Sequence, residues 1–299
     1  MTLPIAAWLP LAAIAAGAVA ASAAQATFSV KADMVAAYAT VTDGDGRLVP
    51  NLTRDDFELS TDGRPHPIAI FESGLQPITI AVLLDDSPST THTRARTEAA
   101  AGELLRHLRP GDKACVGTFD RTVNLDPRLA QSAAELIRRL GERPKAAAGT
   151  VLWDAIGAGI SAVEREGGRR AVVVLTDGED NSSLTDVARL RERIARSGVM
   201  VYAIAIQGPG GRVSPDLRDL ARATGGWFFT LRASDRLAQT FQRIADELHQ
   251  QYMVGFAVTE RDGRAHALSL RVKRRGLSAR VRASYVAPPA GMEVVKDER

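Results

Sequence analysis

The 299-residue chain has few of the residues that form covalent cross-links or bind soft metals. Cys115 is its only cysteine, so the chain has no internal disulfide. This cysteine lies in the strand-like stretch KACVGTF, which predicts a buried, apolar thiol. The five histidines are dispersed along the sequence and match no zinc-ligand spacing. The sequence therefore argues against a zinc site.

Lysine is also scarce, with 5 lysines against 33 arginines, and the formal net charge is only +3. The arginines are scattered along the whole chain and form no single basic block. Proteins that bind nucleic acid usually present a concentrated basic face. The charge pattern therefore argues against a nucleic-acid partner.

The signatures of several common enzyme classes are missing from the sequence. There is no G-x-S-x-G motif and no P-loop, and GPGGR at 208–212 has the composition of a polar loop. Phosphoryl-transfer domains that use an aspartate usually add a charge-stabilising lysine, and none of the five lysines follows a candidate strand end. We expect no enzyme, no catalytic residues and no organic cofactor; a Mg²⁺-dependent phosphoryl-transfer enzyme is the enzymatic alternative.

The amino terminus is apolar. Residues 2–24 carry no charged side chain and end in small residues with an A-x-A-like pattern, which predicts a secretory signal over residues 1–24, cleaved after Ala23 or Ala24. The stretch is also long enough to span a bilayer, so an inner-membrane anchor formed by residues 3–24 is the alternative. Both interpretations predict export, to the periplasm or the extracellular space, and the second adds proximity to a membrane.

Strands alternate with amphipathic helices over residues 75–250. The stretches IAVLL, AVVVL and VYAIAI are apolar on both faces, as is typical of central strands that helices cover on each side. We predict an α/β fold, a Rossmann-like three-layer sandwich with a mostly parallel central sheet. Helices are expected near residues 93–108, 131–140, 151–166, 185–196, 215–223 and 234–250.

The segments on either side of this domain, residues 25–74 and 251–288, have β patterning. DGDGR at 43–47 and TDGRP at 61–65 predict hairpin turns. Later, HALSLRVK and ARVRASY place apolar residues on one face of a strand and arginines on the other, and we expect these arginine faces to be solvated. Neither segment is long enough to fold alone, so we predict that the two pair into a small β-sandwich that holds the α/β domain as an insertion, followed by a tail at 289–299.

Oxygen-bearing side chains occur in three loops of the predicted α/β domain. LLDDSPST contains Asp85, Ser87 and Ser89 in a D-x-S-x-S spacing, Thr150 stands at a helix start, and Asp177 directly follows a buried strand. Ligands of such sheets bind at the carboxyl ends of the strands, where loops converge. Hard divalent cations prefer oxygen ligands, so we predict Mg²⁺ here, with Mn²⁺ or Ca²⁺ as alternatives. Each loop alone would also be explained by helix capping.

Residues from about 75 to 250 resemble a von Willebrand factor type A domain, and the three loops match its metal-ion-dependent adhesion site. The resemblance implies that the hydroxyls of Ser87, Ser89 and Thr150 contact the metal, while Asp85 and Asp177 bind it directly or through water. The longer arrangement, with VTDGDGRLVPNLTRDDFELSTDGRPHPIAIFE before the domain and QYMVGFAV after it, is similar to exported bacterial von Willebrand type A-related proteins.

Some residues near the motif depart from the family pattern or remain outside the ligand set. Pro88 stands where the family commonly has glycine, and proline stiffens the loop because it fixes φ and removes an amide donor. Four nearby acids are not assigned as ligands: Asp86, Asp154, Glu179 and Asp180.

This ligand set favours binding over catalysis. Neutral hydroxyls offset little of the cation's charge, so an open coordination position remains attractive to an incoming carboxylate. We therefore predict a metal-dependent protein-binding or adhesion module of the cell envelope, whose unknown protein ligand presents Asp or Glu to the metal. The alternative is an envelope scaffold protein with a degenerate or purely structural metal site.

Overall fold

The structure is a computed structural model that describes residues 33–90, 93–142, 147–177, 179–207, 214–232 and 237–290. The predicted signal at 1–24, the loop at 208–212 and most of the predicted tail lie outside the described residues. Within the described part of the chain, no helix is both long and apolar enough to cross a membrane.

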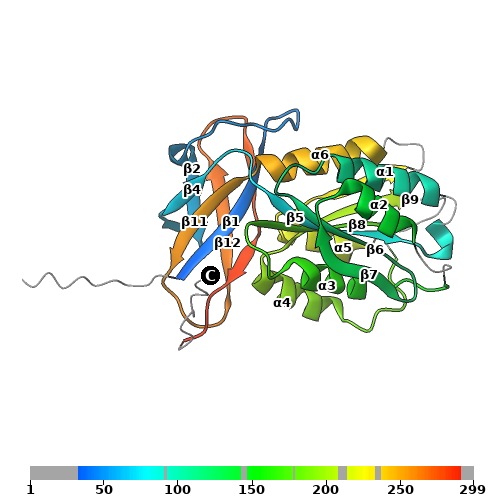
Figure 1. Cartoon of the computed structure of the whole chain (residues 1–299). Helices are drawn as coiled ribbons and strands as arrows, with labels where there is room; N and C mark the ends of the chain where they lie inside the picture. Colours follow the sequence, from blue (N-terminus) through cyan, green and yellow to red (C-terminus); the bar gives the residue numbers. More distant parts are fainter. Residues whose placement is uncertain are drawn as a thin grey trace, which may run out of the picture. The chain divides into compact units, whose positions relative to one another are not determined.

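A six-stranded sheet forms the centre of the α/β part, with the strand order β10-β9-β8-β5-β6-β7 (Figure 1). Its strands are β5 (Ile78–Asp85), β6 (Lys113–Phe119), β7 (Val123–Ala130), β8 (Arg169–Thr176), β9 (Met200–Gln207) and β10 (Phe228–Arg232). All neighbours are parallel except β7, which pairs with β6 in the antiparallel direction. The predicted mostly parallel sheet is confirmed.

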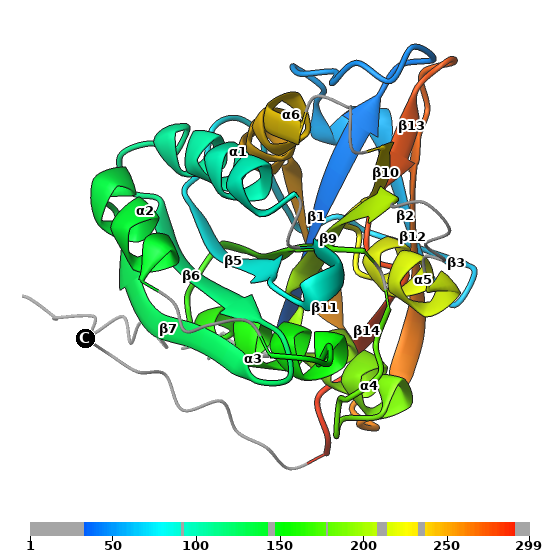
Figure 2. The ribbon, with the colours of Figure 1, turned by 90° about the vertical axis from the view of Figure 1, so that its right-hand side faces the viewer.

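Helices cover both faces of this sheet (Figure 2). They are α1 (Arg94–Arg106), α2 (Ala133–Gly141), α3 (Leu152–Val163), α4 (Val187–Ser197), α5 (Pro215–Ala223) and α6 (Leu237–Gln250). Alternate residues of β5 divide between the layers: Val82 packs with α1, α2 and α6, whereas Leu83 packs with α3, α4 and α5. This division explains why residues 80–84 of β5 are all apolar, since each face of the strand lies in its own core.

The segments before and after the α/β part form two four-stranded sheets, with the orders β13-β1-β11-β4 and β14-β12-β2-β3. The strands are β1 (Asp33–Thr42), β2 (Phe57–Thr61), β3 (Arg64–His66), β4 (Ile70–Glu72), β11 (Tyr252–Val258), β12 (Ala265–Val272), β13 (Ser278–Arg280) and β14 (Ser284–Val286). β1 pairs with β11 and β2 pairs with β12, and the two sheets share one apolar core. The predicted pairing of the flanking segments into extra sheets is confirmed.

The turn between β2 and β3 follows from its residues. Asp62 and Gly63 have φ values of 49° and 76°. Positive φ at both central residues is the conformation of a two-residue hairpin turn, which Asp-Gly sequences favour. Asp62 is further held by its carboxylate, which accepts a hydrogen bond from the Ala267 N–H at 2.8 Å. The hairpin predicted for TDGRP is therefore present.

One strand prediction was wrong. ARVRASY does not form one continuous strand but divides into β13 and β14, which lie in different sheets. The chain leaves the strand path because the Ala283 N–H donates to Ala223 O, at the end of α5, at 2.8 Å. Arg282 likewise turns inward and donates to Ala195 O near the end of α4.

The expectation of solvated arginine faces holds for one strand and fails for the other. On β12, Arg271 is 73% exposed and pairs with Glu58. On β13, Arg280 is only 19% exposed and pairs with Glu247, a buried acid of α6. The sequence alternation is the same in both strands, so the difference arises from the helices that pack against the second one.

Buried polar groups also hold the two ends of the α/β insertion. Arg169, the first residue of β8, is 1% exposed and donates to the carbonyls of Gly74, His249 and Gln251. These carbonyls stand where the chain enters and leaves the insertion. Burial lowers the pKa of Arg169 to about 10. His249 in turn contacts Asp112 through Nε2 at 2.8 Å.

Candidate functional site

The site lies at the carboxyl end of the central sheet, where β5 and β8 run side by side. β5 ends at Asp85 and β8 ends at Thr176, and the two strands stay in register up to the pair Leu84 and Leu175. The Thr176 hydroxyl donates to Asp85 Oδ2 at 2.6 Å. The strand pairing therefore places Asp85 next to the loop that begins with Asp177.

Four of the five predicted ligands are joined by hydrogen bonds. The Ser87 N–H donates to Asp85 Oδ1 at 3.0 Å, and the hydroxyls of Ser87 and Ser89 lie 3.0 Å apart. The Ser89 hydroxyl donates to Asp177 Oδ2. Asp85 and Ser87 are buried, whereas Ser89 is exposed. The first and third loops thus bring two carboxylates and two hydroxyls to one place, open to solvent at Ser89.

A short turn fixes the D-x-S-x-S segment. Pro88–Thr90 form a 3₁₀ turn, and the buried Thr90 hydroxyl lies 2.9 Å from the carbonyl oxygens of both Asp85 and Ser87. This hydroxyl closes the turn from within, so the two serines are held by side-chain bonds as well as by the proline. The stiffening of the loop by Pro88 stays a prediction.

Burial dominates the electrostatics of Asp85. Loss of solvent raises its pKa to about 6, and the charge of Asp177 acts in the same direction. Hydrogen bonds from Ser87 and Thr176 favour the charged form and partly oppose the rise. The site therefore contains a desolvated carboxylate next to a second one, an arrangement that a cation would stabilise.

Thr150 is placed differently from the other four predicted ligands. It is buried, its N–H donates to Asn181 Oδ1 at 2.9 Å, and its carbonyl accepts from the N–H groups of Asn181 and Ser182 at 3.1 Å. Its backbone is therefore attached to the loop that follows Asp177. Among the described residues, no hydrogen bond joins its hydroxyl to Ser87, Ser89 or Asp177.

Helix capping does not explain Thr150. The first residue outside α3 is Val151, which makes no side-chain cap. The Ser183 hydroxyl instead accepts from the N–H groups of Trp153 and Asp154, at 3.1 and 3.2 Å. The start of α3 is thus capped from the third loop, and the Thr150 hydroxyl is not needed for this purpose.

The acids left out of the ligand set have other contacts. Asp154 accepts from the N–H groups of Leu184 and Thr185 at 2.8 and 2.9 Å, so it braces the third loop. Asp180 accepts from the Ser183 hydroxyl at 2.5 Å, and Asp86 is buried and pairs with Arg94 at 3.2 Å. Glu179 is exposed.

The residues present fit a hard divalent cation. Asp177 Oδ1 is buried and has no hydrogen-bond partner among the described residues. An orphaned buried carboxylate oxygen calls for a missing partner, and a cation is one that carboxylates bind well. The described residues contain no group of three or more His, Cys, Asp and Glu able to hold a metal. A site of two carboxylates and several hydroxyls requires no such group.

The sequence-family model of the von Willebrand factor type A domain matches residues 79–243, which is more than half of the chain. The chain belongs to the von Willebrand factor type A domain family. No curated protein sequence matches it.

Several solved structures resemble this von Willebrand factor type A protein. The von Willebrand factor type A protein from Catenulispora acidiphila is 14% identical, with a TM-score of 0.53 over 88% of this chain and 76% of its own. An aerotolerance-related membrane protein from Bacteroides fragilis is 16% identical, with a TM-score of 0.48 over 57% of this chain and 98% of its own. BatB from Bacteroides thetaiotaomicron is 16% identical, with a TM-score of 0.47 over 57% of this chain and 97% of its own. The likeness to the Catenulispora acidiphila protein supports the fold.

Sequence reasoning missed three residues that shape the site. Thr176 binds Asp85, Asn181 binds Thr150, and Asp120 accepts from the Ala147 N–H at 2.8 Å through its carboxylate. Asp120 directly follows β6, just as Asp177 directly follows β8, so an acid after a buried strand was the available signal. The backbone carbonyl of Asp120 also accepts a hydrogen bond from the Val151 N–H at 2.8 Å, which ties the loop containing Thr150 to the end of β6.

Proposed function

We propose that this protein is a metal-dependent protein-binding module of the cell envelope. Asp85, Ser87, Ser89, Thr150 and Asp177 would hold Mg²⁺, or Mn²⁺ or Ca²⁺ in its place. The observation that carries the proposal is the hydrogen-bonded chain of Ser87, Ser89 and Asp177 beside buried Asp85. Asp177 Oδ1 has no partner among the described residues. Membership of the von Willebrand factor type A family supports a protein-interaction role.

The partner would present an Asp or Glu side chain. The donor set has two carboxylates, so hydroxyls would supply much of the remaining inner shell and the ion would keep part of its positive charge. The exposed Ser89 marks the side from which an outside ligand can approach. A bound ion would supply Lewis acidity for this contact, and the residues of the chain would orient it. We assign no catalytic role to any residue.

A specific observation favours the alternative of an envelope scaffold with a degenerate site. The two serine hydroxyls and one oxygen of Asp177 already bond to one another, and Asp85 is satisfied by Thr176 and Ser87. Apart from Asp177 Oδ1, these groups satisfy one another, and such a network does not need an ion for folding. The two candidates therefore differ in whether the protein responds to the metal.

Thermal unfolding with increasing Mg²⁺ or Mn²⁺ distinguishes these candidates. The proposal predicts stabilisation that grows with free ion, about 2.7 kcal/mol at a hundred times the dissociation constant, because the ion binds only the folded state. Asp177→Asn should abolish it. Asp126→Asn is the matched control, since Asp126 lies on β7 and pairs with Arg128. A wild-type protein without any ion-dependent shift would support the scaffold instead.

Export to the periplasm or the extracellular space belongs to the same proposal. Its support is the apolar sequence of residues 2–24 with its small-residue ending. Mass spectrometry of the mature protein tests it: an amino terminus at Ala24 or Gln25 is expected for a cleaved signal, and an intact Met1 would support the anchor.

A further inference from the structure

An arginine-lined cavity lies at the amino end of the central sheet, at the other end from the loops that contain Asp85 and Asp177. Its lining comes from the end of α3, the start of β8 and one face of α4, and consists of Glu164, Arg170, Arg189, Glu192, Arg193, Arg196 and Ser197. The cavity has a volume of about 610 Å³ and is open to solvent. Arg170 lines the cavity near the start of β8, and Thr176 ends β8 beside Asp177. A strand rises about 3.3 Å per residue, so the cavity lies about 20 Å from the loop that begins with Asp177.

The arginines of α4 form a stripe by helical spacing. Arg189, Arg193 and Arg196 are separated by four and three residues, which places them on one face of the helix. A neighbouring face of the helix is fixed in the core by Leu190 and Ile194. The stripe therefore projects from a well-packed helix and lines one wall of the cavity.

Most of these arginines lack a counter-charge. Arg193 donates to Glu164 Oε1 at 3.1 Å and to the Ser161 hydroxyl. Among the described residues, Arg189 and Arg196 make no hydrogen bond or ion pair, and Arg170 Nε is buried without a partner. Four arginines thus face two glutamates, one of which is already engaged.

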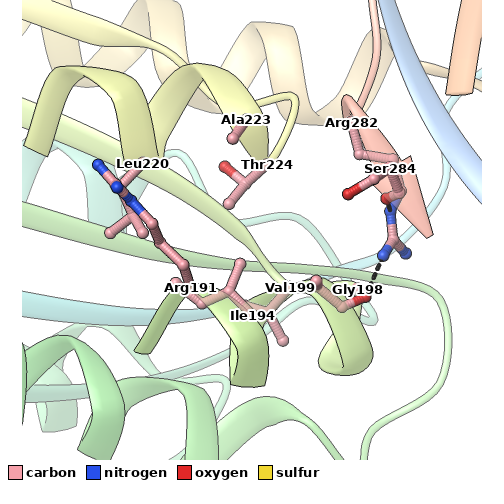
Figure 3. Close-up of a pocket in the computed structure, with 10 residues that line it drawn as sticks. Arg191, Ile194, Gly198, Val199, Leu220, Ala223, Thr224, Arg282 and Ser284 are labelled. Carbon is pink, nitrogen blue, oxygen red and sulfur yellow. Dashed lines mark hydrogen bonds between the residues drawn. The ribbon is translucent and has the colours of Figure 1, made fainter. Parts of the chain in front are cut away.

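A fifth guanidinium increases the local positive charge. Arg282 lies beside Gly198, just beyond the end of α4 (Figure 3). A Cβ placed on Gly198 would stand 3.1 Å from Arg282 Nη1 and 3.6 Å from Arg170 Nη2, so the two guanidinium groups flank this glycine. Among the described residues, the Arg282 guanidinium donates to two carbonyl oxygens, Ser284 O and Ala195 O, and neither acceptor carries a formal charge.

We propose that this cavity binds a phosphate group. Guanidinium groups present planar sets of N–H donors that match the oxygens of phosphate, and the open concave surface lets several of them reach one group. Arg189 and Arg196 supply the donors not already in use among the described residues. Arg170 adds positive charge, although its Nη1 already donates to the carbonyl of Glu164. The phosphate belongs either to a free phosphorylated ligand or to the headgroup of an anionic phospholipid.

The test compares the full wild-type chain with two charge-matched double variants. Arg189→Gln with Arg196→Gln removes the two unpaired arginines, both exposed on α4. Arg106→Gln with Arg138→Gln removes the same charge from α1 and α2, where each arginine is exposed and paired with a glutamate. Pyrophosphate binding is measured by calorimetry with EDTA present, so that the metal site is empty, and vesicle binding by sedimentation with phosphatidylglycerol-containing and pure phosphatidylcholine vesicles.

The proposal predicts that the Arg189 and Arg196 variant loses at least about tenfold in affinity, the equivalent of about 1.4 kcal/mol, while the control variant keeps the wild-type affinity. Binding of pyrophosphate identifies a free phosphorylated ligand as the source. Binding only to phosphatidylglycerol vesicles identifies a lipid headgroup. Equal losses in both variants, or a wild-type protein that binds neither probe, would overturn the proposal. None of these readouts depends on the proposed metal function.

Discussion

Two regions of this molecule bury polar side chains, and they do so in different ways. At the junction where α6 meets the β1–β11 sheet, Glu247 accepts hydrogen bonds from Thr40 and Tyr202 and pairs with Arg280, so one buried acid is satisfied by residues from three other segments. At the carboxyl end of the central sheet, the hydrogen-bonded groups are small hydroxyls and the carboxylates of Asp85 and Asp177.

The difference separates a structural network from the site that we propose binds an ion. The junction has opposite charges and long side chains, and removing one partner leaves the other buried and unpaired. At the carboxyl end, Asp85 and Asp177 bring two carboxylates together, burial raises the pKa of Asp85 to about 6, and Asp177 Oδ1 has no hydrogen-bond partner among the described residues. Such a region is the one in which we propose that an ion from outside the chain binds. Changes at the junction should therefore affect folding, and changes at the carboxyl end should affect ion binding.

The largest effect is expected at Glu247. Glu247→Ala should destabilise the fold by about 3–5 kcal/mol, because it leaves the Arg280 guanidinium without its counter-charge in a buried place. Urea denaturation measures the change. Glu103→Ala is the control, since Glu103 pairs with Arg106 on the surface of α1 and such pairs contribute about 0–1 kcal/mol. Similar losses in the two variants would remove the contrast between the regions.

Arg282 should give the next largest effect. Arg282→Ala should cost about 1–3 kcal/mol, because the carbonyl of Ala195 near the end of α4 loses its charged donor inside the protein. Arg271→Ala, on the solvated face of β12, should cost less than about 1 kcal/mol. Equal unfolding midpoints in urea for the two variants would contradict the inward assignment of Arg282.

Thr150 tests the one predicted ligand whose hydroxyl is not joined to the others. Thr150→Val should leave metal-free stability close to the wild type, because the contacts of Thr150 to Asn181 and Ser182 are made by its backbone. A tenfold loss in ion affinity would reduce the metal-dependent stabilisation from about 2.7 to about 1.4 kcal/mol. Thermal unfolding at fixed Mg²⁺ measures it. An unchanged metal response would remove Thr150 from the ligand set.

The smallest effect is expected at His266, far from both regions. Hydrogen bonds to Asp62 and then to Asp262 raise the pKa of His266 above its ordinary value of 6.5. The resulting stabilisation is fully present below pH 6.5 and is lost as the pH rises through the raised value. His266→Gln should thus cost more stability at about pH 5.5 than at about pH 9. Urea denaturation of the wild type and the variant at both pH values measures this loss of stability. An equal loss at the two pH values would mean that the two aspartates do not stabilise the charged imidazole ring.

The sequence predicted those parts of the fold that depend on local pattern. The uninterrupted apolar run of β5 and the periodicity of Leu237, Phe241 and Ile244 in α6 each correspond to an element of the expected type. The D-x-S-x-S spacing also placed Asp85 and Ser89 near Asp177, because parallel strands end at the same edge of a sheet.

What could not be predicted depends on partners that are distant in sequence. The alternation around Arg280 and Arg282 does not reveal that Glu247 and the end of α4 lie beside them. The role of Thr176 was hidden for a related reason, since its acceptor Asp85 lies 91 residues earlier in the chain. A hydroxyl at a strand end is compatible with capping, solvent or a ligand, and only the tertiary arrangement selects among these uses.

Water-proton relaxation of the Mn²⁺ complex tests most directly whether the carboxyl-end loops hold an ion with one place free. The expected result is an enhanced relaxation rate in the wild type, which falls when a short acidic peptide replaces the coordinated water and which is absent in Asp177→Asn. An enhancement of equal size in Asp177→Asn, or a wild-type protein that binds no Mn²⁺, would contradict the account.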